Sequence, residues 1–154
     1  MQKLLVLGVG NILLKDEGLG VHAVQDLQQE SWPIGVDFMD GGTFTQDVFY
    51  LFEGYKQVLV LDIIRAGGEP GSMYHITEQD LIRDKQQALS LHDIDLLDSL
   101  RMAELAGHKP ELEVLGLEPE KIDWGLEMTP ALQQAYPGLL QKARQRIQGI
   151  LEQG

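Results

Sequence analysis

The chain contains 154 residues, 44% of them hydrophobic, with no cysteine and a formal net charge of -12. This length fits a single domain spanning residues 1–154, which can bury roughly 70% of the surface of its unfolded chain. The lack of cysteine excludes disulfides and cysteine-ligated zinc. Because the lysines and arginines are few and scattered, the acidic surface should repel phosphate backbones, and we expect no nucleic-acid partner.

The N-terminal residues do not follow the pattern of a signal peptide. Met1-Gln2-Lys3-Leu4 leads directly into a short apolar run and then glycines, without the apolar length and cleavage site of such a peptide. No apolar stretch approaches the ~20 residues that span a membrane. We therefore expect a cytoplasmic protein with no membrane partner. Because nothing in the sequence demands a dimer, we also expect a monomer.

In the first half of the chain, apolar runs predict strands that are buried on both faces of a parallel sheet. These runs cover residues 3–7, 36–39 and 58–64. Residues 17–29 are predicted to be helical because their apolar positions recur every three or four residues. A turn over 40–43 should lead into a second helix that ends near residue 53, since Thr43 and Gln46 have the spacing of a capping box.

In the second half, strands are predicted at 73–76 and 113–117, and helices from about 92 to 107 and from 130 to 151. The inward face of the last helix is predicted to contain Leu132, Leu139, Leu140, Ala143, Ile147 and Ile150. Residues 77–91 are polar and weakly periodic, which predicts a long loop. We expect this loop to make partner-specific contacts, since loops on a rigid scaffold often carry recognition.

Strands and helices thus alternate along the chain, without internal repeats. Such alternation predicts an α/β fold, in which helices cover both faces of a mostly parallel sheet. We expect a single-domain three-layer sandwich with a twisted sheet and right-handed crossovers.

Several polar residues follow the predicted strands. The first strand runs into a glycine-rich stretch that ends near Asp16 and Glu17, and the third strand carries Asp62 after four apolar residues. His92 opens the helix after the long loop. Ligands of open α/β sheets bind beyond the carboxyl ends of the strands. We therefore expect Glu17, Asp62 and His92 to reach one edge of the sheet from three separate junctions.

The glycine-rich stretch is not a dinucleotide-binding loop. Gly8 and Gly10 match the first two glycines of that fingerprint, but Leu13 stands at the third position. Asp16 and Glu17 at the start of the helix would repel a pyrophosphate, which needs bare amides there. A Walker loop is also absent from the sequence.

Each candidate also has an ordinary structural interpretation. Asp16 and Glu17 could stabilise the helix dipole, Asp62 could cap a turn, and His92 could be an unremarkable helix residue. As a set, two carboxylates and one imidazole suit Ni, Zn, Mn or Fe without selecting among them. The spacing of zinc proteases, a Gly-x-Ser-x-Gly elbow and a cysteine nucleophile are all missing. These residues alone predict a metal-binding or acid–base site and do not name its reaction.

The sequence resembles the hydrogenase maturation proteases over nearly its whole length. Residues 8–20 (GVGNILLKDEGLG) resemble the N-terminal signature of that family. Four further motifs follow in the family's order, at residues 40–43 (DGGT), 59–62 (LVLD), 90–92 (SLH), and 116–119 (GLEP) together with 124–130 (WGLEMTP). Five ordered motifs are far more specific than any one of them.

The resemblance implies an endopeptidase that removes the C-terminal extension of a nickel–iron hydrogenase large-subunit precursor. It implies that Glu17, Asp62 and His92 bind nickel supplied by that precursor, with other divalent ions able to occupy the site. These three residues, together with Asp16, are the candidate catalytic residues. The family is often grouped with the aspartic peptidases, but the resemblance leaves the chemistry of cleavage open. Such an enzyme would activate the hydrogenase that it processes.

Two alternatives belong to other classes of function. The same fold could serve a non-enzymatic metal-sensing or chaperone module in hydrogenase assembly, because fold does not fix function. A nucleotide-binding domain is disfavoured by the acidic start of the first helix. Cleavage of a nickel-loaded precursor, complex formation without cleavage, and tight nucleotide binding would separate the three.

Overall fold

The computed structural model describes residues 2–42, 52–83 and 91–153, with only the backbone of 2–3, 81–83 and 91–95. A five-stranded sheet has the order β2-β1-β3-β5-β4. Its strands are β1 (Gln2–Val9), β2 (Val36–Gly42), β3 (Tyr55–Ile63), β4 (Met73–Thr77) and β5 (Glu111–Leu117). The first three and β5 are parallel, and β4 lies antiparallel to β5 at one edge. The expected mostly parallel sheet is confirmed.

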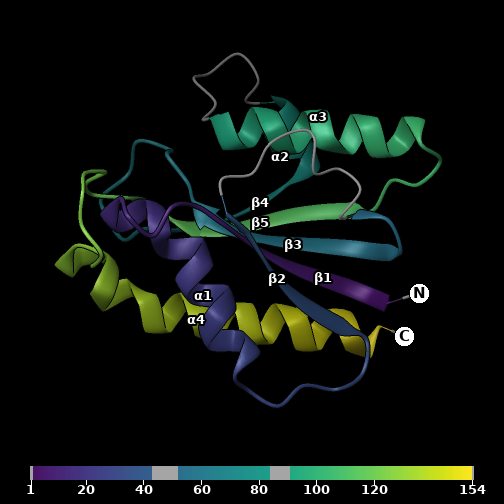
Figure 1. Cartoon of the computed structure of the whole chain (residues 1–154), viewed down its shortest axis with the longest axis horizontal. Helices are drawn as coiled ribbons and strands as arrows, with labels where there is room; N and C mark the ends of the chain where they lie inside the picture. Colours follow the sequence, from purple (N-terminus) through teal and green to yellow (C-terminus); the bar gives the residue numbers. More distant parts are fainter. Residues whose placement is uncertain (1, 43–51, 84–90, 154) are drawn as a thin grey trace.

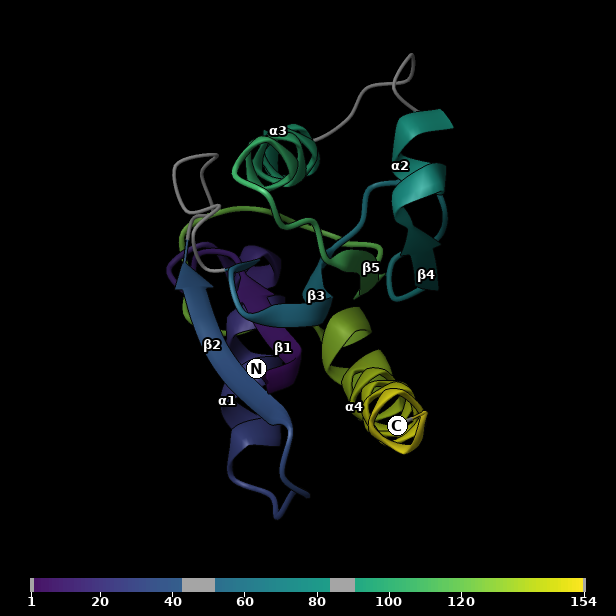
Figure 2. The ribbon, with the colours of Figure 1, turned by 90° about the vertical axis from the view of Figure 1, so that its right-hand side faces the viewer.

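Helices cover both faces of this sheet, as the alternation predicted. Figure 2 shows α1 (Leu19–Gln28) and α4 (Pro130–Glu152) on one side, and α2 (Glu78–Arg83) and α3 (Leu91–Leu105) on the other. A short 3-10 turn, η1 (Lys15–Gly18), precedes α1. In the part of the chain that the structure describes, no helix is both long and apolar enough to cross a membrane.

Two apolar layers hold the sandwich together. Alternate residues of β1 point to opposite faces, so Leu4 and Val6 pack with α1 and α4, whereas Leu5 and Leu7 pack toward α3. Strand β3 divides in the same way. A strand with apolar neighbours on both faces needs an uninterrupted apolar run, and this is why the central strands were visible in the sequence.

Two segments differ from the predicted elements. β2 continues through Asp40 to Gly42, where a turn was expected, because Gly8 and Val9 of β1 still pair with it. The predicted loop over 77–91 contains α2, which begins with a reciprocal cap. There, the Thr77 amide donates to Asp80 Oδ2 at 2.9 Å and the Asp80 amide to Thr77 Oγ1 at 3.3 Å.

Other predicted features agree with the structure or lie outside it. α3 ends at Leu105, just before Gly107, whose φ of 99° suits the expected stop. The predicted helix that starts at Thr43, with its capping box to Gln46, lies outside the described residues. On α4, the predicted inward residues are buried except Leu140, which is only partly buried against the same core.

The two neighbouring leucines of α4 provide a test of this packing. Leu139→Ala should lower the free energy of unfolding by about 2–5 kcal/mol, because it leaves a cavity beneath a fully buried side chain. Leu140→Ala should cost clearly less. Urea unfolding of both variants, with Gln141→Ala on the exposed face as control, measures the difference. Equal losses for the two leucines would contradict the assigned inward face.

Candidate functional site

The start of α1 lies in direct backbone contact with the carboxyl ends of β1 and β3. A Cβ atom on Gly8 would stand 2.3 Å from the carbonyl oxygen of Gly20. A Cβ atom on Gly20 would stand 2.0 Å from the carbonyl oxygen of Leu61, the residue before Asp62. No side chain fits in either place, so two glycines allow η1 and α1 to close over the strand ends.

Glu17 lies in η1, half-buried, on a turn that is closed by its own backbone. The Asn11 amide donates to the Glu17 carbonyl oxygen at 3.0 Å, and the Glu17 amide donates to Leu14 at 3.1 Å. Gly10, with φ of 145°, approaches so closely that a Cβ atom there would lie 1.9 Å from the same Glu17 oxygen. The Gly10 amide also donates to Gly42 at 2.8 Å, which joins this turn to the end of β2.

Asp62 stands near the end of β3 and is 1% exposed. Its Oδ1 accepts a hydrogen bond of 2.8 Å from the amide of Ile63. On the neighbouring strand, a Cβ atom at Gly116 would lie 1.9 Å from the Asp62 carbonyl oxygen, so β5 also approaches closely here. Burial of a carboxylate is costly unless polar groups or a cation compensate it. Its burial therefore leaves the Asp62 carboxylate desolvated.

His92 lies in the first turn of α3. Figure 1 shows that α3 starts on the side of the carboxyl ends of the strands and runs back toward the amino end of β5. The backbone therefore brings His92 to the same end of the sheet as Glu17 and Asp62. Among the side chains that the structure describes, no three His, Asp or Glu form a metal-binding group. The side chain of His92 lies outside that set, so the three-residue site stays a prediction.

Asp16 is fully buried and joins η1 to the loop between β5 and α4. Its Oδ2 accepts from the amides of Glu120 at 2.8 Å and Lys121 at 3.0 Å. Its Oδ1 accepts from the amide of Thr129 at 2.8 Å, and the Thr129 hydroxyl also reaches both oxygens. Four neutral donors converge on one carboxylate. Its partners are more than a hundred residues away in the chain, so no local pattern could have revealed them.

Glu118 is a second buried carboxylate, which the sequence analysis did not single out. It follows β5 and is 6% exposed. Its Oε1 accepts from the amides of Ala66 and Gly68, both at 2.9 Å, and from the Tyr74 hydroxyl at 3.0 Å. These bonds fix the loop that follows β3. The GLEP motif contained this residue, but only the fold shows which loop it organises.

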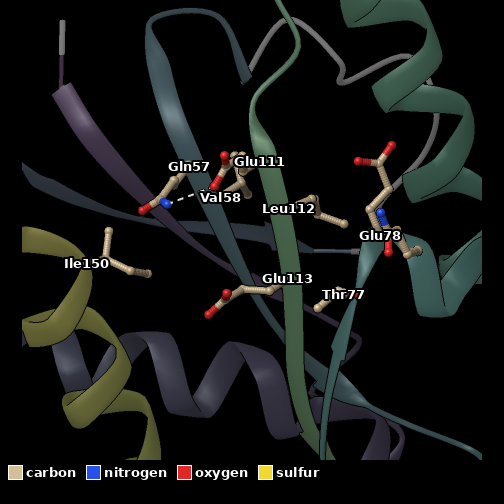
Figure 3. Close-up of a pocket in the computed structure, with 9 residues that line it drawn as sticks. Gln57, Val58, Thr77, Glu78, Glu111, Leu112, Glu113 and Ile150 are labelled. Atoms are coloured by element: carbon tan, nitrogen blue, oxygen red, sulfur yellow. Dashed lines mark hydrogen bonds between the residues drawn. The ribbon is translucent and has the colours of Figure 1, made fainter. Parts of the chain in front are cut away.

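A cavity of about 310 Å³ lies at the opposite, amino end of the sheet (Figure 3). Its carboxylates are occupied by structural pairs. Glu78 pairs with Lys109 at 2.6 Å, Glu113 pairs with Arg146 at 2.8 Å, and Gln57 donates to Glu111 at 3.1 Å. Ligands of such sheets bind at the other end, so the candidate site remains at the carboxyl ends.

Comparison with known proteins supports the resemblance to the hydrogenase maturation proteases. A family model described as "Hydrogenase maturation protease" matches residues 21–146. The hydrogenase 2 maturation protease of Escherichia coli K12 is 31% identical over 134 residues, or 85% of this chain and 82% of the relative. The hydrogenase expression/formation protein HupD of Rhizobium leguminosarum bv. viciae is 32% identical, over 92% of this chain and 72% of that protein.

The solved structures agree with this assignment. The hydrogenase maturating endopeptidase HybD of E. coli superposes with a TM-score of 0.86 and 28% identity, over 96% of this chain and 93% of that one. The family model covers well over half of the chain, and two of these relatives are named as a protease and an endopeptidase. The chain therefore belongs to the hydrogenase maturation protease family and is a peptidase.

Proposed function

We propose that this peptidase removes the C-terminal extension of a nickel–iron hydrogenase large-subunit precursor. We further propose that it recognises nickel already inserted in that precursor through Glu17, Asp62 and His92. The observation that carries this proposal is the placement of these residues. A closed turn, a buried strand end and the start of α3 bring them to one end of the sheet from three separate elements.

The donor set fits a metal that belongs to the substrate. Two carboxylates and one imidazole are hard to borderline donors, and three of them leave coordination positions open. Thiolates of the precursor would hold nickel more firmly than this set does. The peptidase would then bind a metal that belongs to its substrate, so cleavage would require prior insertion of nickel into the precursor. Glu17, on its rigid turn, and Asp62, already desolvated, would need little rearrangement to bind it.

Asp16 has a different role in this proposal. Both of its oxygens accept hydrogen bonds from amides and a hydroxyl of one loop. We assign it to positioning, because it fixes η1, and with it Glu17, against the loop before α4. Glu118 does the same for the loop after β3.

A chaperone that binds the precursor without cutting it was the alternative that the sequence left open. The family names favour the peptidase. Mass spectrometry of a nickel-loaded precursor after incubation separates the two, since only a peptidase releases a small C-terminal fragment. A cytoplasmic location and a monomeric state stay predictions.

Three substitutions, each to a neutral amide side chain, test the proposed ligands. Glu17→Gln, Asp62→Asn and His92→Gln should each weaken binding of the nickel-loaded precursor more than about tenfold and slow its cleavage at least as much. The melting temperature should change little for Glu17→Gln, because the substitution keeps the shape of a half-buried side chain and loses a dipole interaction of about 0.3–1 kcal/mol. Binding, cleavage and thermal unfolding are measured on the same preparations, with Glu104→Gln on the exposed face of α3 as control.

Binding and cleavage, measured together, show whether each residue acts as a ligand or as a catalyst. If the Glu17→Gln or His92→Gln protein cleaved the precursor at the wild-type rate, that residue would not belong to the site. Lost cleavage with unchanged nickel-dependent binding would instead make the residue a catalyst rather than a ligand.

The positioning role of Asp16 has its own signature. Asp16→Asn should lower the free energy of unfolding by about 1–3 kcal/mol or more, because buried amides lose their acceptor. Thr129→Val removes the hydroxyl that donates to Asp16, at a position far from Glu17 in the sequence. It should reproduce part of that loss. Urea unfolding and cleavage kinetics are measured for both. If Asp16→Asn abolished cleavage while unfolding stayed like wild type, Asp16 would be catalytic instead.

A further inference from the structure

We propose that an exposed apolar surface beside Glu17, together with the hollow at its edge, docks the polypeptide of the precursor near the cleaved bond. We call it the docking surface and define it by Ile12, Leu13, Trp124 and Leu126. Its occupant would be an extended segment with an apolar side chain next to cationic ones. This inference rests on the proposed function and names the part of the substrate that this surface recognises.

Large apolar side chains are exposed together here. Ile12 is 40% exposed, Leu13 49%, Trp124 75% and Leu126 67%. Among the described residues, the other exposed large apolar side chains, Ile34, Met73 and Leu105, lie on separate elements. Single exposed apolar residues are normal, but a contiguous group marks an interaction site.

Backbone hydrogen bonds hold the two halves of the docking surface side by side. The Gly125 amide donates to Leu13 at 2.9 Å, and the Lys15 amide donates to Gly125 at 2.9 Å. Leu14 and Gly125 thereby form a parallel bridge. Asp16 fixes the same loop through Glu120, Lys121 and Thr129. The surface is therefore preformed, so binding would require little ordering of the chain.

The docking surface leads into an open hollow of about 320 Å³ between α1 and the start of α4. Leu126, Met128 and Tyr136 line it together with His22, Asp26 and Glu127. The hollow also adjoins η1, because a Cβ atom on Gly18 would lie 3.2 Å from His22 Nε2. Gly18 directly follows Glu17 in η1. One continuous surface thus extends from the proposed metal site to the hollow.

The charges around this surface favour a cationic segment. Asp26 and Glu127 stand in the wall of the hollow, and the Tyr136 hydroxyl donates to Asp26 Oδ2 at 2.5 Å. Burial and the nearby Asp26 carboxylate raise the pKa of Tyr136, so its hydroxyl stays protonated and donates to Asp26. A second copy of this chain would bring another net charge of -12 to the same place. Repulsion therefore disfavours self-association, whereas a cationic segment of the precursor would complement the carboxylates of the hollow.

Steady-state cleavage of a nickel-loaded, full-length precursor tests the proposal. The Trp124→Ala/Leu126→Ser double variant should raise KM by about tenfold with kcat nearly unchanged, because it removes contacts that are the same in the ground and transition states. Its melting temperature should match wild type, since both side chains are exposed. Ile34 lies on the loop between α1 and β2 and is 99% exposed. Ile34→Ser is therefore the matched control and should leave KM unchanged.

Binding of the nickel-free precursor separates docking from metal recognition. The double variant should weaken binding of nickel-free and nickel-loaded precursor by the same factor, whereas Glu17→Gln should affect only the loaded form. Asp26→Asn/Glu127→Gln should weaken both and reduce the dependence of affinity on salt, with Glu104→Gln as control.

Three results would count against the proposal in different ways. A wild-type KM in the double variant, with cleavage intact, would overturn docking and leave the proposed function standing. Wild-type self-association that the double variant abolishes, without a change in KM, would make the surface a dimer interface. A wild-type enzyme that neither binds nor cleaves the precursor would overturn the proposed function, and docking with it.

Discussion

The candidate site depends on one close contact, where the backbone of α1 meets the ends of β1 and β3 at Gly8 and Gly20. A helix normally packs on a sheet through side chains, which keep the two backbones apart. Here both contact residues are glycines without side chains, so the start of α1 lies directly on the strand ends. The carboxylate that precedes α1 and the one that ends β3 thereby belong to one region, although they are 45 positions apart in the printed sequence.

Hydrogen bonds to two buried carboxylates complete this arrangement. Asp16 binds the loop before α4, and Glu118 binds the loop after β3. Loops at the carboxyl ends of strands usually vary and move more than the strands themselves. The hydrogen bonds that each carboxylate accepts restrict the motion of its loop. Several hydrogen bonds therefore hold the two loops beside Glu17 and Asp62.

The sequence predicted those features that follow from local pattern. The central strands were visible because both faces are apolar, and α4 because its buried residues recur over many turns. The start of α2 was missed although Thr77 and Asp80 have the spacing of a cap, since the surrounding residues lack an apolar period. Leu140 was placed too far inward, because helical spacing cannot tell the centre of a buried face from its margin.

The candidate site was predictable as a set of residues but not as a geometry. Ordered motifs pointed to Glu17, Asp62 and His92, and the topology placed their backbones at one end of the sheet. The partners of Asp16 and the exposure of Trp124 depend on a loop that only the folded chain brings near. Long-range contacts of this kind leave no periodic signal in the sequence.

The bond between Thr129 and Asp16 spans 113 positions and also bears on the order of folding. Closing so long a segment is entropically unfavourable until the intervening sheet has formed. During synthesis, the turn that carries Glu17 therefore emerges early but acquires its anchor only when the residues leading into α4 have been added. Any proteolytic competence that depends on this turn would arise only after the segment leading into α4 has been synthesised.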